Sequence, residues 1–245
     1  MVVNQNLMRV SVIIPTHNEA QAIGHVLAEL PPDLVSEIIV VDSNSNDGTP
    51  EIAQKMGARV VHEPRRGYGR ACLSGLAHAS SPDVVVFLDG DYSDRPSELP
   101  ILLGPIIDGS ADITLGSRLN GKSNRGALPW HQSFGNRLAA GLIRLLYGVK
   151  VSDLGPFRAG RANVLRALAL EEPTYGWAVE MILKGALAGF RIVEVPVSYY
   201  PRIGKSKISG TLKGTAGAAW FILSRIVLYY FRRRRPATPQ PTQSA

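Results

Sequence analysis

The first 117 residues alternate short apolar runs with stretches of helical spacing. Several of the apolar runs are β-branched throughout rather than at alternate positions, which is typical of strands covered on both faces. They predict strands at Val10–Pro15, Glu37–Asp42, Arg59–Glu63, Val84–Asp89 and Ile113–Ser117. The stretches between them predict helices at Ala20–Leu30, Thr49–Met56, Gly67–Ala79 and Ser97–Asp108. Such alternation predicts an α/β fold with a Rossmann-like, mostly parallel sheet flanked by helices.

After Arg118 the pattern changes, and a polar, glycine-rich segment at 120–129 predicts a loop. The rest of the chain predicts a helix at Trp130–Tyr147, a short extended piece at Asp153–Phe157, helices near Ala162–Leu170 and Trp177–Ala188, a strand at Arg191–Val197, a basic loop at Ile203–Gly210 and a helix at Leu212–Phe231. Pro196 favours the sheet edge for its strand, because proline cannot donate a ladder hydrogen bond.

The last predicted helix is apolar on more than one face. One stripe is expected to face the protein core, and it consists of Leu212, Ala216, Ala219, Leu223, Val227 and Tyr230. The apolar stretch 216–231 is broken by Ser224 and Arg225 and is shorter than a bilayer span requires. Four arginines follow it, at 232–235. Segment 212–235 is therefore predicted to be an amphipathic helix that lies on an anionic membrane surface, with self-association into a homo-oligomer or core packing as alternatives.

Composition adds few constraints. The chain has 245 residues and is 45% hydrophobic, which suits one large domain. Cys72 is the single cysteine, so no intrachain disulfide is possible and a reducing compartment suits the chain. The net charge of +7 is concentrated at 232–235, so nucleic-acid binding would rest on charge alone and is not predicted. The N-terminus has no secretory-signal pattern, and the tail at 236–245 is expected to be disordered.

Polar loops follow three of the predicted strands, at the sheet rim where ligands bind in doubly wound folds. The first loop carries Pro15, Thr16, Asn18 and Glu19 and lacks the G-x-G-x-x-G of dinucleotide enzymes, which disfavours hydride transfer. Helix capping by Asn18 and Glu19 is the alternative interpretation of this loop.

The second loop runs from Asp42 to Thr49 and includes Asn44. Asp42 ends a buried strand, where its carboxylate could accept hydrogen bonds from ribose hydroxyls or a base N–H. Asp47 and Thr49 are also explained by turn and helix-cap chemistry.

The third loop contains Asp89-Gly90-Asp91 directly after an apolar strand. Two carboxylates this close repel each other unless a cation lies between them. Mg²⁺ and Mn²⁺ prefer oxygen ligands and often join one or two protein carboxylates to substrate phosphates. The triplet therefore predicts a divalent-cation site, with Asp89 and Asp91 as ligands, that stabilises a departing nucleotide diphosphate.

These loops resemble glycosyltransferase family 2, whose members have the nucleotide-sugar-binding GT-A fold. The segments that carry the resemblance are VSVIIPTHNEA (with 11–20 at its core), EIIVVDSNSNDGT (37–49) and VVVFLDGDYSD (84–94). Further likeness to polyprenyl-phosphate sugar transferases of the dolichol-phosphate mannosyltransferase type lies in LGSR (115–118), DLGPFRA (153–159), the block 174–211 and the apolar C-terminal helix. The resemblance spans about residues 9–230.

The resemblance implies a catalytic domain at 1–211, with a nucleotide-binding half at 9–118 and an acceptor half at 119–211. The predicted nucleotide-sugar site comprises Pro15, Thr16, Asn18, Glu19, Asp42, Asn44, Asp89 and Gly90. The predicted acceptor and phosphate site comprises Arg118, Arg137, Arg202, Lys205, Ser206 and Lys207. Asp91 and Asp153 are the predicted catalytic residues, and Asp153 matches the acid near the acceptor in inverting members.

The resemblance implies transfer of a hexose from a nucleotide-diphosphate sugar to a polyprenyl phosphate, with inversion, by a cytoplasmic enzyme at the inner face of the membrane. The residues themselves leave the donor and the acceptor open. Tyr92–Pro96 lacks the Gln-His of many dolichol-phosphate mannose synthases, and Leu154–Phe157 differs from their Cys-Gly-Phe, so the donor could be UDP-glucose or GDP-mannose. A lipid-phosphate acceptor needs cations rather than a base, whereas a hydroxyl acceptor needs a base, for which Asp153 is the candidate. A non-catalytic, membrane-associated binding protein is the alternative from a different class.

Overall fold

The structure is a computed structural model. It describes the backbone of residues 8–121, 130–204 and 212–233, and the side chains of 8–121, 133–204 and 221–231. The predicted phosphate ligands Lys205, Ser206 and Lys207 lie outside the described residues, as does the predicted tail at 236–245.

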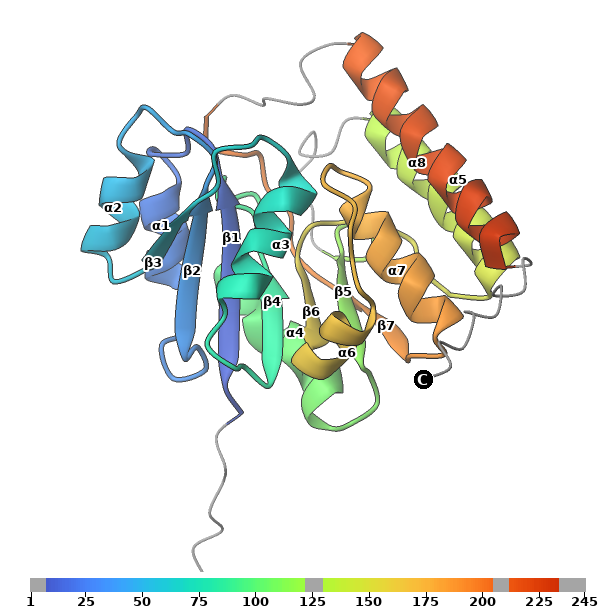
Figure 1. The fold of residues 1–245 in the computed structure, drawn as a ribbon, viewed down its shortest axis with the longest axis horizontal. Helices are drawn as coiled ribbons and strands as arrows, with labels where there is room; N and C mark the ends of the chain where they lie inside the picture. Colours follow the sequence, from blue (N-terminus) through green and yellow to red (C-terminus); the bar gives the residue numbers. More distant parts are fainter. Residues whose placement is uncertain (1–7, 122–129, 205–211, 234–245) are drawn as a thin grey trace, which may run out of the picture.

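The described residues form one seven-stranded sheet in the order β3-β2-β1-β4-β6-β5-β7 (Figure 1). The strands are β1 (Val10–Thr16), β2 (Glu37–Asp42), β3 (Arg59–His62), β4 (Val84–Phe87), β5 (Ile113–Ser117), β6 (Arg158–Arg161) and β7 (Ile192–Pro196). All neighbouring strands are parallel except those that pair with β6. The predicted mostly parallel sheet is confirmed, and β7 with Pro196 lies at its edge.

The predicted extended piece at Asp153–Phe157 is wrong in its position, because the strand β6 begins at Arg158. The backbone N–H groups of Ser152 and Asp153 donate to the carboxylate of Glu194 instead of to a neighbouring strand. Residues 153–157 therefore form a loop that enters the only antiparallel strand of the described sheet, between β4 and β5.

Helices cover both faces of the sheet (Figure 1). They are α1 (Ile23–Glu29), α2 (Thr49–Lys55), α3 (Tyr68–His78), α4 (Leu99–Ile107) after a 3-10 turn at Pro96–Glu98, α5 (Trp130–Tyr147), α6 (Ala162–Ala167), α7 (Trp177–Leu187) and α8 (Leu212–Arg233). Alternate residues of β1 point to two different cores: Val12 and Ile14 pack with α1 and α4, and Ile13 packs with α3 and α7. Burial on both faces explains the continuous apolar runs.

Helix α1 begins at Ile23, three residues later than the pattern predicts. The reason lies in the preceding loop, where the backbone N–H groups of Glu19 and Ala20 donate to side chains of the second loop, Thr49 Oγ1 at 2.8 Å and Asp47 Oδ2 at 3.0 Å. Glu19 and Ala20 therefore join the first loop to the second instead of starting the helix.

Helices α5 and α8 lie side by side beyond α7, away from the sheet (Figure 1). The predicted inward stripe of α8 is partly wrong: Ile226 is fully buried, whereas Val227 is 39% exposed. Tyr147 of α5 donates from its hydroxyl to the Ile226 carbonyl at 2.6 Å, which joins α5 to α8 at this buried residue.

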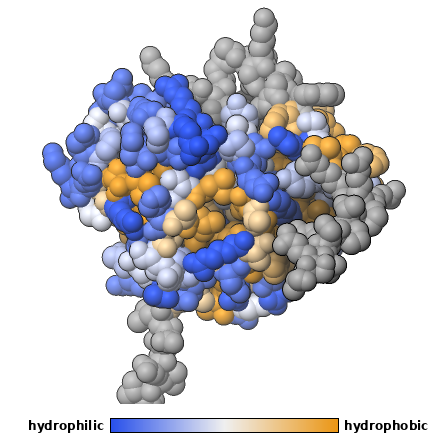
Figure 2. Space-filling view, viewed as in Figure 1, coloured by the Kyte–Doolittle hydropathy of each residue, from blue (hydrophilic) through white to orange (hydrophobic). Residues whose placement is uncertain are grey.

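Apolar side chains remain exposed on both helices of this pair, and they are Phe134, Leu138 and Leu145 on α5 and Val227, Leu228 and Phe231 on α8. Figure 2 shows apolar atoms gathered at the upper right, where Figure 1 places these helices. Within the described residues, no helix combines the length and hydropathy that crossing a bilayer would require.

Candidate functional site

The carboxyl ends of β2, β1 and β4 are neighbours in the sheet, so the three polar loops predicted from the sequence meet at one rim. They enclose an open cleft of about 440 Å³. The predicted residues that line this cleft are Pro15, Thr16, Glu19, Asp89, Gly90, Asp91 and Arg202.

The first two loops are joined by hydrogen bonds. His17 Nδ1 lies 2.7 Å from the Ser43 carbonyl oxygen, and the Asn18 backbone N–H donates to Ser45 Oγ at 2.8 Å. Asn18 adopts a positive φ of 55°, which asparagine tolerates better than most residues do. The loops are therefore joined along one wall of the cleft, to which His17 and Ser43 contribute.

Asp42 organises this wall from within. Its side chain is 2% exposed, and it accepts bonds from the backbone N–H of Ser45 at 3.0 Å and from the Ser45 hydroxyl. Asn44 is exposed and donates to the Pro64 carbonyl at 2.6 Å. Neither residue lines the cleft, so their predicted contact with the nucleotide stays a prediction.

Asp47, rather than Thr49, accepts the bonds at the start of α2. Its Oδ1 accepts from the backbone N–H of Thr49 at 3.1 Å and from the Thr49 hydroxyl at 2.6 Å. The turn interpretation of Asp47 agrees with these contacts. The predicted cap by Thr49 is wrong, because Thr49 is the first residue of α2 and no side chain caps the helix from the preceding position, Gly48.

Asp89 and Asp91 lie at the floor of the cleft. Gly90 between them allows close approach to the first loop, because a Cβ there would lie 2.9 Å from Thr16 Cγ2. Burial, and then the neighbouring charge of Asp91, raise the pKa of Asp89 to about 7. Asp91 Oδ1 accepts from Ser93 N–H at 2.9 Å and from the Ser93 hydroxyl at 2.6 Å. The carboxylate is thereby oriented by its own loop, in which Tyr92 has a positive φ of 62°.

Arg202 lies across the same cleft. Its Nη2 donates to Glu19 Oε1 at 2.8 Å, and its Nη1 lies 3.3 Å from Asp91 Oδ2. The segment that carries Arg202 is fixed to the acidic loop by its backbone, since Tyr200 N–H donates to the Ser93 carbonyl and Ile203 N–H to the Asp91 carbonyl.

A second cation, Arg118, is paired with Asp153. The two side chains are joined by Nε–Oδ2 and Nη2–Oδ1 bonds of 2.7 and 2.8 Å, and the Arg118 backbone N–H also donates to Oδ2. Asp153 is 1% exposed. Burial acts to raise the pKa of Asp153, but the bonds from Arg118 outweigh it and hold that pKa below its usual range.

Two further residues hold Asp153, and the sequence analysis missed both. Asn136 of α5 donates from Nδ2 to Asp153 Oδ1 at 2.7 Å. Glu194 of β7 accepts from the backbone N–H groups of Ser152 and Asp153 at 2.9 and 3.0 Å. Arg137, the predicted phosphate ligand next to Asn136, is exposed on α5.

The cleft also has walls that the sequence analysis did not predict. Arg66, Gly67 and Tyr68 form one side, and Thr174 with Tyr175 form another. Arg66 and Gly67 follow β3 at the same end of the sheet as the other loops, so the strand-end rule could have identified them. Gly67 is required, because it has a φ of 145° and a Cβ there would lie 2.3 Å from the Pro173 carbonyl oxygen.

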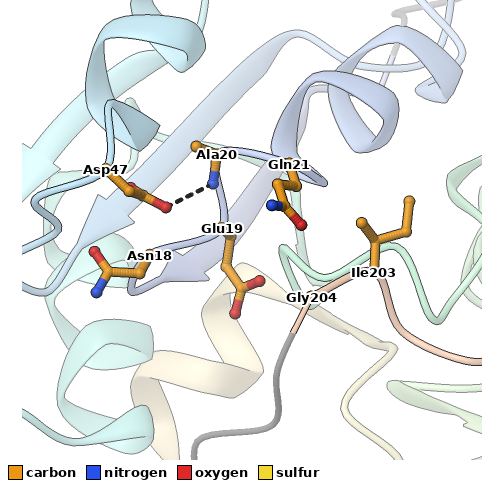
Figure 3. A pocket seen from close by; sticks show the side chains of 7 residues that line it. All are labelled: Asn18, Glu19, Ala20, Gln21, Asp47, Ile203 and Gly204. Carbon is orange, nitrogen blue, oxygen red and sulfur yellow. Dashed lines mark hydrogen bonds between the residues drawn. The ribbon is translucent and has the colours of Figure 1, made fainter.

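A second pocket of about 430 Å³ shares Glu19 with the cleft as a lining residue. Asn18, Gln21 and Asp47 form one side and Ile203 with Gly204 the other (Figure 3). In Figure 3 the Glu19 side chain extends between Asn18 and the Ile203–Gly204 segment, and Glu19 also lines the cleft.

Comparison with known proteins agrees with this geometry. Residues 11–169 match the sequence model of glycosyl transferase family 2. The chain is 35% identical over 231 residues to the undecaprenyl-phosphate mannosyltransferase of Micrococcus luteus, covering 85% of this chain and 91% of that protein. It is 37% identical over 211 residues to the dolichyl-phosphate hexose transferase of Haloferax volcanii, covering 84% and 89%.

Among solved structures, the fold is similar to that of glucosyl-3-phosphoglycerate synthase from Mycobacterium tuberculosis in complex with Mn²⁺, UDP and glucosyl-3-phosphoglycerate. The TM-score is 0.73 at 24% sequence identity, over 91% of this chain and 80% of the other. This likeness supports the predicted GT-A fold. The matched family, the relatives and the fold agree, and the chain belongs to glycosyl transferase family 2 and is a glycosyltransferase.

Proposed function

We propose that this enzyme transfers a hexose from a nucleotide-diphosphate sugar to a polyprenyl phosphate, with inversion at the anomeric carbon. The observation that carries the proposal is the cleft itself, where Asp89 and Asp91 lie beside Arg202 at the ends of parallel strands. The names of the Micrococcus and Haloferax relatives support a lipid-phosphate acceptor.

Asp89 and Asp91 suit a divalent cation, because they offer carboxylate oxygens in one cleft and Ser93 orients that of Asp91. The described residues contain no group of three or more acidic, histidine or cysteine side chains that could hold a metal ion. The remaining ligands would therefore be water and the donor's diphosphate oxygens, which is the usual arrangement for Mg²⁺ or Mn²⁺. When bound, such a cation supplies Lewis-acid stabilisation of the departing nucleotide diphosphate.

The state of Asp153 favours a phosphate acceptor over a hydroxyl acceptor. Both of its oxygens accept bonds from Arg118, and its pKa is held low, so it is a weak proton acceptor near neutral pH. A lipid phosphate is already ionised and needs cations to hold it. We infer that Asp153 positions Arg118 for this purpose, and that Arg202 holds phosphate oxygens on the donor side.

A hydroxyl acceptor is the second candidate. The solved neighbour was crystallised with glucosyl-3-phosphoglycerate, a product whose sugar is linked to a small molecule. In that case Asp153 would act as the general base after release from Arg118.

We further propose that the enzyme acts at the inner face of the cytoplasmic membrane as a peripheral protein. Helices α5 and α8 expose apolar side chains, and their sequences contain arginine and lysine but no acidic residue. Such a surface suits anionic lipid headgroups. An oligomer contact through the same helices is the alternative.

A transfer assay tests these proposals. UDP- and GDP-sugars are each incubated with Mn²⁺ or Mg²⁺, with and without a short-chain polyprenyl phosphate, and the glycolipid and the free nucleotide are measured. Metal-dependent glycolipid formation is expected with at least one donor. Transfer to a hydroxyl acceptor but never to the lipid phosphate would select the second candidate. Absence of metal-dependent turnover with every donor would contradict the proposed function and favour a binding protein.

A further inference from the structure

Arg202 connects two loops that have to bind different parts of the donor. It donates to Glu19 in the loop after β1 and contacts Asp91 in the acidic loop after β4. Its side chain is 27% exposed, so the contact with Asp91 lies in a partly water-excluded place.

The two oxygens of Asp91 have different surroundings. Oδ1 accepts two bonds from Ser93 within its own loop, and Oδ2 is the atom 3.3 Å from Arg202 Nη1. The Arg202 guanidinium therefore contacts Oδ2, the Asp91 oxygen that accepts no bond from Ser93. The same oxygen is suited to bind a metal cation.

We propose that Arg202 is a positioning residue that couples metal binding to donor binding: it holds Asp91 Oδ2 in the metal-free enzyme and exchanges this carboxylate for the donor's diphosphate when the metal binds. The inference rests on the proposed function, since it takes Asp89 and Asp91 as the metal ligands.

Charge explains the exchange. In the metal-free enzyme, the guanidinium compensates the adjacent carboxylates of Asp89 and Asp91. A divalent cation at Asp91 would repel a guanidinium a few ångströms away and would remove its anionic partner. The diphosphate supplies a new anionic partner, which arginine binds by paired hydrogen bonds. The Nε of Arg202 is buried and has no hydrogen-bond partner within the described residues, so it offers a further donor once the side chain moves.

The backbone allows such a movement without unfolding the site. Tyr200 N–H and Ile203 N–H hold their segment to the acidic loop by bonds of 2.9 and 3.0 Å, one on each side of Arg202. The stack of Arg95 between the rings of Tyr92 and Tyr200, at 4.3 and 4.0 Å, adds a second attachment. The side chain can therefore change partners while its anchor stays in place.

Mn²⁺ binding to the full chain tests the coupling. Free Mn²⁺ is measured by electron paramagnetic resonance, with and without UDP, for the wild type and Arg202→Gln. We expect the variant to bind Mn²⁺ alone about tenfold more tightly or better, because the competing cation is gone. The factor by which UDP increases Mn²⁺ affinity should fall by a similar amount, since the two ligands are coupled reciprocally.

Arg66→Gln is the matched control. Arg66 is an exposed arginine that lines the same cleft, so its removal changes the charge equally without touching Asp91. Its Mn²⁺ affinity in the absence of UDP should stay within about twofold of the wild type, by the screening of exposed charges. Arg202→Met, which keeps most of the aliphatic stem, is measured alongside in case the glutamine variant does not fold.

Unchanged or weaker Mn²⁺ binding in folded Arg202 variants would overturn the proposal, as would equal tightening in the Arg66 variant. If the wild type transfers sugar but the Arg202 variants bind Mn²⁺ no more tightly than the wild type, the coupling is refuted and the proposed function is left intact. A wild type that binds no Mn²⁺, with Asp91→Asn indistinguishable from it, would instead refute the metal assignment.

Discussion

Replacing Asp153 by asparagine removes one charge from a buried ion pair and changes almost nothing in side-chain volume. The pair is well formed, with side-chain exposures of 11% for Arg118 and 0% for Asp153. Asparagine keeps one acceptor oxygen but places an N–H₂ group against the donors of Arg118 and Asn136. Breaking a buried pair by removing one partner costs about 3–5 kcal/mol, because the other charge stays buried and uncompensated.

Asp112→Asn provides the matched control for this measurement. Asp112 also accepts a guanidinium, from Arg191, with an Nη2–Oδ1 distance of 2.8 Å, but the Arg191 side chain is 57% exposed. Exposed pairs contribute about 0–1 kcal/mol, so the same chemical change should have a small effect there. The two variants therefore compare a buried ion pair with an exposed ion pair of similar geometry.

The assay is thermal unfolding followed by circular dichroism, together with the pH dependence of transfer. For a chain of this size, 1 kcal/mol corresponds to about 2–4 °C in Tm, so Asp153→Asn should lower the Tm by about 6–20 °C and Asp112→Asn by less than about 4 °C. Equal shifts in both variants would refute the argument from burial. A wild-type rate that rises with pH through a single ionisation, absent in Asp153→Asn, would show a general base and refute the positioning role.

Three other predictions concern the metal, the buried Glu180 of α7 and the basic end. Asp91→Asn should abolish metal-dependent transfer while the far-ultraviolet circular dichroism stays unchanged, because it removes one of two charged ligands; near-normal Mn²⁺-stimulated activity would contradict the metal assignment. Burial acts to raise the pKa of Glu180, but Lys184, the backbone N–H groups of Glu171 and Glu172 and the Tyr229 hydroxyl outweigh it and lower that pKa from 4.5. The stabilisation by Glu180 should therefore be complete above the unfolded pKa and be lost as the pH falls through the lower folded pKa. The Tm difference between the wild type and Glu180→Gln should be largest near neutral pH and should shrink as the medium is acidified; a difference independent of pH would refute this. Removal of residues 232–245 should weaken binding to vesicles that contain anionic lipid and leave transfer to a soluble acceptor nearly unchanged; a large loss of soluble turnover would assign the segment a structural role instead.

Much of the fold could be predicted because local patterns and global packing agree. Apolar, largely β-branched runs such as Val84–Phe87 are buried on both faces of the sheet. A run without alternating polar residues is typical of such burial. The extended piece before Arg158 could not be placed correctly, since its backbone hydrogen bonds go to Glu194, a residue about 40 positions later in the chain. A side-chain contact over that separation leaves no local pattern.

For the candidate site, the sequence by itself determined that the polar loops lie at one rim of the sheet. Asp89, Asp91 and Glu19 each follow a strand, and the ends of neighbouring parallel strands meet at one rim whatever the packing of the rest. The tertiary structure decided which of the charged groups are paired. It joined Asp153 to Arg118 and Arg202 to Asp91, across 35 and 111 residues, and it turned Asp42 inward to its own loop. The physical reason is that the positions of the strands along the chain are encoded in short apolar runs, whereas the pairing of charges depends on distances that exist only after the chain has folded.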